Sequence, residues 1–242
     1  MERIKEAALQ AFEGGVSSII LKGSALTEDF IPGFSDLDVH VYVSSRYMRS
    51  ERVPQLEQAI RFQRGIGDLR PERHGVSSFQ IYFIDASKYP EDWSRPLPGT
   101  YRVVYGGSID DSASTEEHME RAHENLREYE GYIDSLIGRF VDKPDSALSG
   151  MVRLVGIFLK GAILSAATVA HRDPEISKRM SLQDLIASLG EKGLDLTTAT
   201  RFFSEVREWD SHLDNPERCR ETFGVGIEAL DVIKEWYSSL TD

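Results

Sequence analysis

Cysteine is almost absent from this 242-residue chain, which contains only Cys219. One thiol can form neither an internal disulfide nor a cysteine-rich zinc site. Basic residues are also in the minority, because 28 Lys and Arg stand against 40 Asp and Glu, for a formal net charge of −12. Nucleic-acid backbones are bound through Lys and Arg, so this balance disfavours nucleic acid as the main partner.

The chain also lacks an uninterrupted apolar run of about 18 residues, the length that a membrane span needs. Its most apolar stretch, 146–170, contains Arg153 and Lys160 and is expected to be the buried central helix of a bundle. The N-terminal residues 1–10 are charged and have a helical pattern, unlike a secretory signal. We therefore expect a cytoplasmic protein with no membrane partner.

What the chain does contain is a stretch, 22–43, whose order of residues indicates a chemistry. An apolar run is followed by Gly23-Ser24, and a second apolar run opens with Ser-Asp-Leu-Asp at 35–38. Residues two apart on a strand point the same way, so Asp36 and Asp38 would present two carboxylates side by side. Such a pair repels unless a cation lies between the charges, and oxygen ligands of this kind suit Mg²⁺.

Mg²⁺ usually shares its coordination with substrate phosphates, which predicts a phosphate-binding element nearby. Gly23 and Ser24 can supply it through a close backbone approach, free N–H groups and a hydroxyl. Taken singly, a Gly-Ser pair is more often a plain turn, and an Asp-x-Asp is usually solvated or capping. The two motifs together, each beside an apolar strand, favour a site for a metal and a nucleoside triphosphate.

Alternation along the second strand gives it a polar face and an aliphatic face. The aliphatic face is expected to pack on helices. His40 is expected to be a hydrogen-bonded structural histidine. Lys22, at the end of the first strand, could meet phosphate, but a lysine there is more often exposed. The polar face would carry Asp36, Asp38, His40 and Tyr42, and the aliphatic face Leu37, Val39, Val41 and Val43.

Gly23-Ser24 followed by Ser35-Asp36-Leu37-Asp38 resembles the signature of the polymerase-beta-like nucleotidyltransferase superfamily, and is most similar to that of the aminoglycoside nucleotidyltransferases. The resemblance implies an α/β (α+β) fold, with an N-terminal nucleotidyltransferase domain over 1–110 and a C-terminal helical substrate-binding bundle over 111–242. The N-terminal sheet would be mixed, with about four to five strands.

The resemblance also implies a reaction. The enzyme would transfer a nucleoside monophosphate to a hydroxyl on a small-molecule acceptor. The donor would be ATP, which gives AMP, or another NTP, which gives the corresponding monophosphate. Asp36 and Asp38 would be catalytic metal ligands for Mg²⁺, and Gly23 and Ser24 would bind the nucleotide. A negative net charge attracts cations, which suits a polycationic aminoglycoside, although it can equally serve solubility alone.

The third predicted strand, 76–84, departs from the resemblance. Members of the superfamily usually carry a third carboxylate at mid-strand, and here that catalytic position holds Gln80. Glutamine cannot take a proton from a hydroxyl, although its carbonyl oxygen could hold a metal or a water. Asp85 falls on the opposite face by parity, so the base could instead be Glu72 or a carboxylate of the C-terminal half. The alternative is a nucleotide-binding or interaction module that has lost transfer.

A fourth strand is predicted over 100–105, and a polar linker puts the domain boundary near residue 110. Arg153 and Lys160 lie seven residues apart, on one face of their helix. They are expected either to reach an interdomain cleft and bind triphosphate, or to snorkel or pair within the bundle. The basic run 177–179 reads as surface. Helices are predicted over 2–13, 50–63 with Ser50 as its cap, 115–140, 146–170, 181–190, 196–210 and 216–239.

Overall fold

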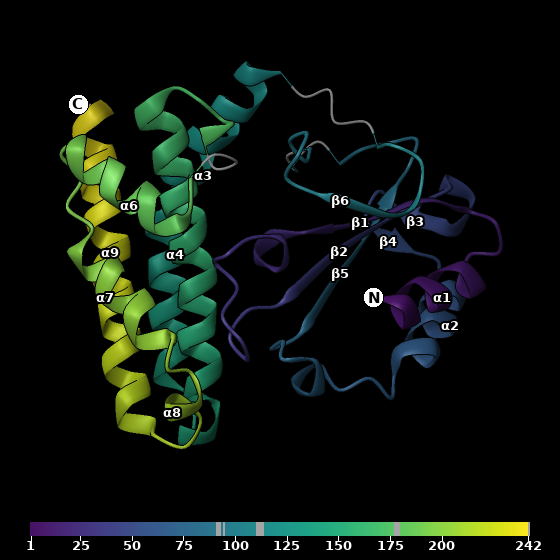
Figure 1. Cartoon of the computed structure of the whole chain (residues 1–242), viewed down its shortest axis with the longest axis horizontal. Coiled ribbons are helices and arrows are strands. Elements are labelled where there is room, and N and C mark those ends of the chain that lie inside the picture. Colours follow the sequence, from purple (N-terminus) through teal and green to yellow (C-terminus); the bar gives the residue numbers. More distant parts are fainter. Residues whose placement is uncertain (91–92, 94, 110–113, 177–179, 242) are drawn as a thin grey trace. The chain divides into compact units, whose positions relative to one another are not determined.

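The computed structural model describes residues 1–90, 93, 95–109, 114–176 and 180–241 (Figure 1). The chain divides into two compact units, Met1–Ala113 and Ser114–Asp242. The first contains a mixed sheet with helices, and the described part of the second is helical, which confirms the predicted fold class. The boundary expected near residue 110 and the basic run 177–179 lie outside the described residues.

The main sheet of the first unit has four strands in the order β5-β2-β1-β6. Strand β2 is antiparallel to β1 and parallel to β5, and β6 is antiparallel to β1, so the sheet is mixed as predicted. The strands are β1 (Val16–Lys22), β2 (Leu37–Val43), β3 (Met48–Ser50), β4 (Val53–Pro54), β5 (Phe79–Asp85) and β6 (Arg102–Gly106). The helices and 3₁₀ turns are α1 (Glu2–Ala11), η1 (Gly23–Leu26), η2 (Ser45–Tyr47), α2 (Leu56–Ile66) and η3 (Pro71–His74).

One face of this sheet packs on the helices of the first unit. Val39, Val41 and Val43 of β2 are fully buried in one core with Ile4 of α1 and Phe62 of α2. Burying aliphatic surface in this way is the main favourable contribution to folding. The predicted aliphatic face of β2 is therefore confirmed.

The opposite face of the sheet carries a smaller apolar cluster in its middle. Ile20, Tyr42 and Ile84 are buried there, and the half-buried rings of Tyr89 and Trp93 pack against them. The chain after β5 thus returns over this face. The polar end of the same face, where β2 begins, contains Asp36 and Asp38.

Residues 48–54 correct the sequence prediction, because they form the two-stranded sheet β3–β4 and not the first turn of a helix. The residue before a proline favours extended backbone, which suits Val53 to a strand. Gln55 fixes the end of the hairpin, since its side-chain amide donates to the Met48 carbonyl at 3.0 Å. Helix α2 therefore begins at Leu56, and Ser50 is a strand residue.

The second unit is built around α4. This helix packs against α3, α6 and α9, and the residues described after 114 include no strand. The helix expected over 196–210 is interrupted, because α7 ends at Val206 and α8 begins at Asp210. The elements are α3 (Thr115–Val141), η4 (Asp145–Ala147), α4 (Leu148–His171), α6 (Leu182–Glu191), α7 (Thr197–Val206), α8 (Asp210–Leu213) and α9 (Pro216–Thr241).

Within the described residues, the segment Asp145–His171 is long and apolar enough to cross a membrane by length and composition alone. The apolar composition of this segment is also that of a helix buried in a protein core. Val152, Val155, Leu159 and Ile163 are fully buried inside the helical unit. The expected role of this segment, the buried centre of a bundle, matches this packing.

Candidate functional site

Strand register brings three polar side chains into one row at the end of the sheet. Lys22 of β1 is opposite Asp38 of β2, and Asp38 is in turn beside Gln80 of β5. The pairing of β2 with β5 extends upstream, because the Leu37 N–H donates to the Ser78 carbonyl at 3.0 Å. Asp36 is the residue directly before Leu37. Both carboxylates therefore lie at the end of the sheet where β2 and β5 begin and β1 ends.

The Gly23-Ser24 turn touches this row directly. Gly23 has φ +73°, in the left-handed region, and a Cβ added to it would lie 2.4 Å from Oδ2 of Asp38. Only glycine fits both the backbone conformation and the close approach of a carboxylate. The two motifs that are separate in the sequence are therefore adjacent, and Ser24 follows in the same 3₁₀ turn.

Both the nitrogen and the oxygen of the Gln80 side-chain amide make hydrogen bonds. Its Nε2 donates to Oδ2 of Asp36, and its Oε1 accepts a hydrogen bond from the Tyr82 hydroxyl at 2.7 Å. The carbonyl oxygen that the sequence offered as a metal or water ligand is thus engaged with Tyr82. The side of Gln80 that faces the carboxylates is its N–H group.

Lys22 lies opposite Asp38, although a lysine at a strand end is expected to be exposed to solvent. The side chain is half-buried and not exposed. Burial lowers the pKa of its ammonium group, and the negative charge of Asp38 partly opposes this. The sequence signal was available, since Lys22 directly precedes the glycine of the first motif.

His40 lies one step further into the sheet, with only 3% of its surface exposed. Its ring packs edge-on against Tyr82 and is tilted against Trp93, with centroids 5.4 and 5.1 Å away. Burial, and then the charge of Lys22, lowers the pKa of His40 to about 3, so the ring is neutral. The predicted hydrogen bond is not made at Nδ1, which has no partner among the described residues.

Tyr82 was not identified from the sequence, although it lies on the same face of β5 as Gln80. Burial raises the pKa of its hydroxyl, and the charges of Asp38 and Asp36 raise it further. The hydroxyl is therefore protonated at neutral pH and stays a donor. Its alternation with Gln80, two residues earlier, could have revealed it.

A third carboxylate does not join Asp36 and Asp38 in the part of the chain that is described, where no group of three or more His, Cys, Asp or Glu could hold a metal. Asp85 pairs with Val43 at the far end of β5, about 16 Å from Gln80 at the usual rise of a strand. It accepts hydrogen bonds from Ser45 and Ser87. Glu72, on η3, is exposed.

Arg153 and Lys160 do not belong to the unit that carries the carboxylates. Both are half-buried on α4 in the helical unit. Their role in binding triphosphate stays a prediction.

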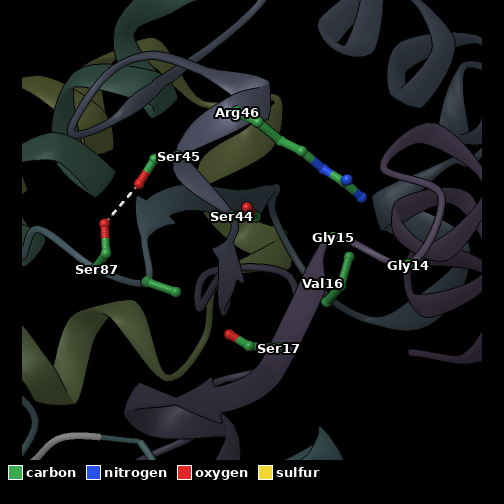
Figure 2. A pocket seen from close by; sticks show the side chains of 9 residues that line it. Gly14, Gly15, Val16, Ser17, Ser44, Ser45, Arg46 and Ser87 are labelled. Carbon is green, nitrogen blue, oxygen red and sulfur yellow. Dashed lines mark hydrogen bonds between the residues drawn. The ribbon is translucent and has the colours of Figure 1, made fainter.

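A cavity of about 350 Å³ lies at the opposite end of the sheet, where β1 begins and β2 and β5 end. Gly15, Ser17, Ser45, Arg46 and Ser87 are among its lining residues, and Figure 2 shows Ser45 and Ser87 pointing toward one another. Their hydroxyls also contact the Asp85 carboxylate, and Ser17 donates to the Tyr42 carbonyl at 3.3 Å. The protons of these three hydroxyls are already donated within the protein.

Comparison with protein-family models gives no match, and comparison with curated proteins gives no significant match.

Proposed function

We propose that this protein is a Mg²⁺-dependent nucleotidyltransferase that transfers AMP from ATP, or the corresponding monophosphate from another NTP, to a hydroxyl acceptor. The observation that carries the proposal is the contact of the Gly23 turn with the Asp38 carboxylate. A phosphate held by that turn would lie beside a cation held by the carboxylates. The similarity of the two motifs to those of the polymerase-beta-like superfamily supports the same reading.

The donor set fits Mg²⁺. Asp36 and Asp38 are half-buried carboxylates at one end of the sheet, and Mg²⁺ in nucleotide sites is usually held by one or two carboxylates together with substrate phosphates. When bound, the cation neutralises charge on the triphosphate and on the departing pyrophosphate. Asp36 and Asp38 would hold it, while N–H groups at Gly23 and Ser24 and the Ser24 hydroxyl would bind phosphate oxygens.

In this reaction the acceptor oxygen forms a bond to the α-phosphorus as the bond from that phosphorus to the bridging oxygen breaks, and pyrophosphate leaves. The hydroxyl proton must pass to a base. Gln80 cannot take it, because an amide is neutral and its N–H group already donates to Asp36. Glu72 is the candidate base in the first unit.

An aminoglycoside is the acceptor class that best suits the charge of the chain. The formal net charge is −12, and an acidic surface speeds the encounter with a polycationic ligand. The protein would use ATP and a small molecule as partners, in the cytoplasm, without nucleic acid or membrane.

A nucleotide-binding module without transfer is the second candidate, and the state of Gln80 favours it. The position where a third carboxylate would act holds an amide that donates to Asp36, and the described residues provide no third acidic ligand. Binding of Mg-ATP would survive in such a module, whereas the transfer step would be lost.

Incubation with Mg²⁺, a panel of aminoglycosides and ATP labelled at the α-phosphate separates the two candidates. Label that moves into the aminoglycoside, with release of pyrophosphate, supports the transferase. Binding of ATP that depends on Mg²⁺, without label in any aminoglycoside, supports the binding module or an acceptor outside the panel.

Gly23→Ala is expected to weaken binding of Mg-ATP by about tenfold or more, since displaced supports of metal ligands usually cost about 10- to 100-fold in affinity. The new Cβ would push against Oδ2 of Asp38, 2.4 Å away. Titration calorimetry with Mg-ATP measures the change. Gly75→Ala is the matched control, because Gly75 has a similar φ of +67° and no neighbour within 4 Å. Equal binding by both variants would contradict the assigned role of Gly23.

A further inference from the structure

Lys22 is the only Lys or Arg in the elements that build the candidate site. Strands β1, β2 and β5, the 3₁₀ turn η1 and the loop between η1 and β2 contain no other. One Mg²⁺ is already balanced by the charges of Asp36 and Asp38, so the triphosphate of a bound nucleotide needs another cationic group. Within these elements, Lys22 is the side chain that can supply it.

The side chain of Lys22 begins where the two motifs meet. In the antiparallel pairing of β1 with β2, Lys22 is opposite Asp38. Opposite residues of such a pair point to the same face of the sheet, with Cβ atoms about 4.5–5.5 Å apart. Lys22 also directly precedes Gly23, whose turn approaches Oδ2 of Asp38. The Lys22 side chain and the Gly23 turn therefore flank the same carboxylate.

The charge of Lys22 is not taken up by an ion pair. The side chain is half-buried, and burial lowers the pKa of its ammonium group. Lys22 nevertheless forms no ion pair within the part of the chain that the structure describes. A simple counter-ion of Asp38 would be expected to form such a pair. A half-buried charge without a partner is unfavourable, and a bound phosphate would offset that cost.

We propose that Lys22 binds the phosphates of the nucleotide, as the cationic partner of the Gly23-Ser24 turn. This inference rests on the proposed function, since it takes the nucleotide to bind at this turn with its cation on Asp36 and Asp38. An ammonium group has three N–H donors and no acceptor, and lysine is a common ligand of phosphate. Its contribution should grow with the number of phosphates, so ATP depends on Lys22 more than AMP does.

Lys22→Met keeps an unbranched apolar side chain but removes the charge, and it is expected to affect two ligands differently. Mg-ATP should bind about tenfold or more weakly, because charge-assisted hydrogen bonds to phosphate are among the stronger ones. Mn²⁺ alone should bind at least as tightly as it does to the wild type, since a positive charge beside Asp38 opposes a cation. Titration calorimetry measures Mg-ATP, and the electron paramagnetic resonance signal of free Mn²⁺ measures the metal.

Lys5→Met is the matched control for the loss of one positive charge. Lys5 is also half-buried in the first unit, but it lies on α1, the helix that packs on the opposite face of the sheet, and pairs with Glu2. Its affinity for both ligands should equal that of the wild type. Lys22→Arg keeps the charge and should retain more of the affinity for Mg-ATP than Lys22→Met does. Thermal melts check the fold, and Lys22→Gln replaces Lys22→Met if the apolar variant unfolds.

Four results would count against a phosphate ligand, and they differ in what they leave standing. Tighter binding of both Mn²⁺ and Mg-ATP by Lys22→Met would show that Lys22 only balances the charge of Asp38. Weaker binding of both, with an unchanged melt, would show that Lys22 positions Asp38. Unchanged binding of Mg-ATP would overturn the inference and leave the metal site in place. Failure of the wild type to bind Mg-ATP would overturn the proposed function, and the inference with it.

Discussion

Asp38→Asn is expected to abolish Mg²⁺-dependent binding of ATP, with a loss of affinity of at least about 100-fold. Outer partners of metal ligands already cost about 10- to 100-fold when removed, so the loss of a ligand itself should cost more. The substitution keeps the shape of the side chain and removes its charge. It also leaves the Lys22 ammonium opposite an amide in place of a carboxylate. Titration calorimetry with Mg-ATP, and the label-transfer assay if the protein is active, measure the effect.

Asp68→Asn is the control for the general loss of one negative charge. Asp68 is in the same unit but highly exposed, where it pairs with Arg3 at 3.5 Å, and exposed pairs contribute only about 0–1 kcal/mol. Its affinity for Mg-ATP should equal that of the wild type. If Asp38→Asn also bound Mg-ATP like the wild type, the carboxylates would not be the metal site, and the proposed function would lose its basis.

Much of the fold could be read from periodicity. The alternation of β2 correctly separated Asp38 and His40 from Val39 and Val41, because parity on a strand decides which face a side chain takes. The hairpin over 48–54 was misread as a helix start, since Ser50 followed by an acidic residue is typical of a helix cap. The extended preference of a residue before proline was the better guide there.

The contacts within the candidate site were harder to predict. The spacing of the motifs predicted that Gly23 and Asp38 would be neighbours, but the 2.4 Å approach depends on the path of the loop between them. The orientation of the Gln80 amide follows from the Asp36 carboxylate, which can only accept, and patterns of hydrophobicity do not encode this contact between two strands. Lys22 was expected in solvent because lysine usually is, yet its side chain is half-buried and its register partner is Asp38.

At its end, the edge strand β6 packs closely against β1, the strand that leads into the site. Gly106 has φ +80°, and a Cβ added to it would lie 2.0 Å from the Ser17 carbonyl oxygen. The obstacle is backbone and not a side chain that could turn away. Ser18 holds the same junction, because its hydroxyl donates to the Gly107 carbonyl at 2.9 Å.

Gly106→Ala is therefore expected to destabilise the first unit by roughly 3–5 kcal/mol. About 1–3 kcal/mol would come from the left-handed backbone, and about 1 kcal/mol from each hydrogen bond lost as β6 separates from β1. This is a large part of the roughly 5–15 kcal/mol that stabilises a typical domain. Hydrogen exchange at increasing urea concentrations, read on peptides that cover β1 and β2, measures the free energy of unfolding of this unit.

Gly107→Ala provides the comparison for this prediction, since a Cβ on Gly107 has no neighbour within 4 Å and its φ is not in the left-handed region. It should change the free energy of unfolding by less than about 0.5 kcal/mol, as surface substitutions usually do. Equal stability of the two variants would mean that β6 can move away from Ser17 without cost. The edge of the sheet would then not depend on a glycine at position 106, and β1 would hold Lys22 and Gly23 beside Asp38 through its pairing with β2 alone.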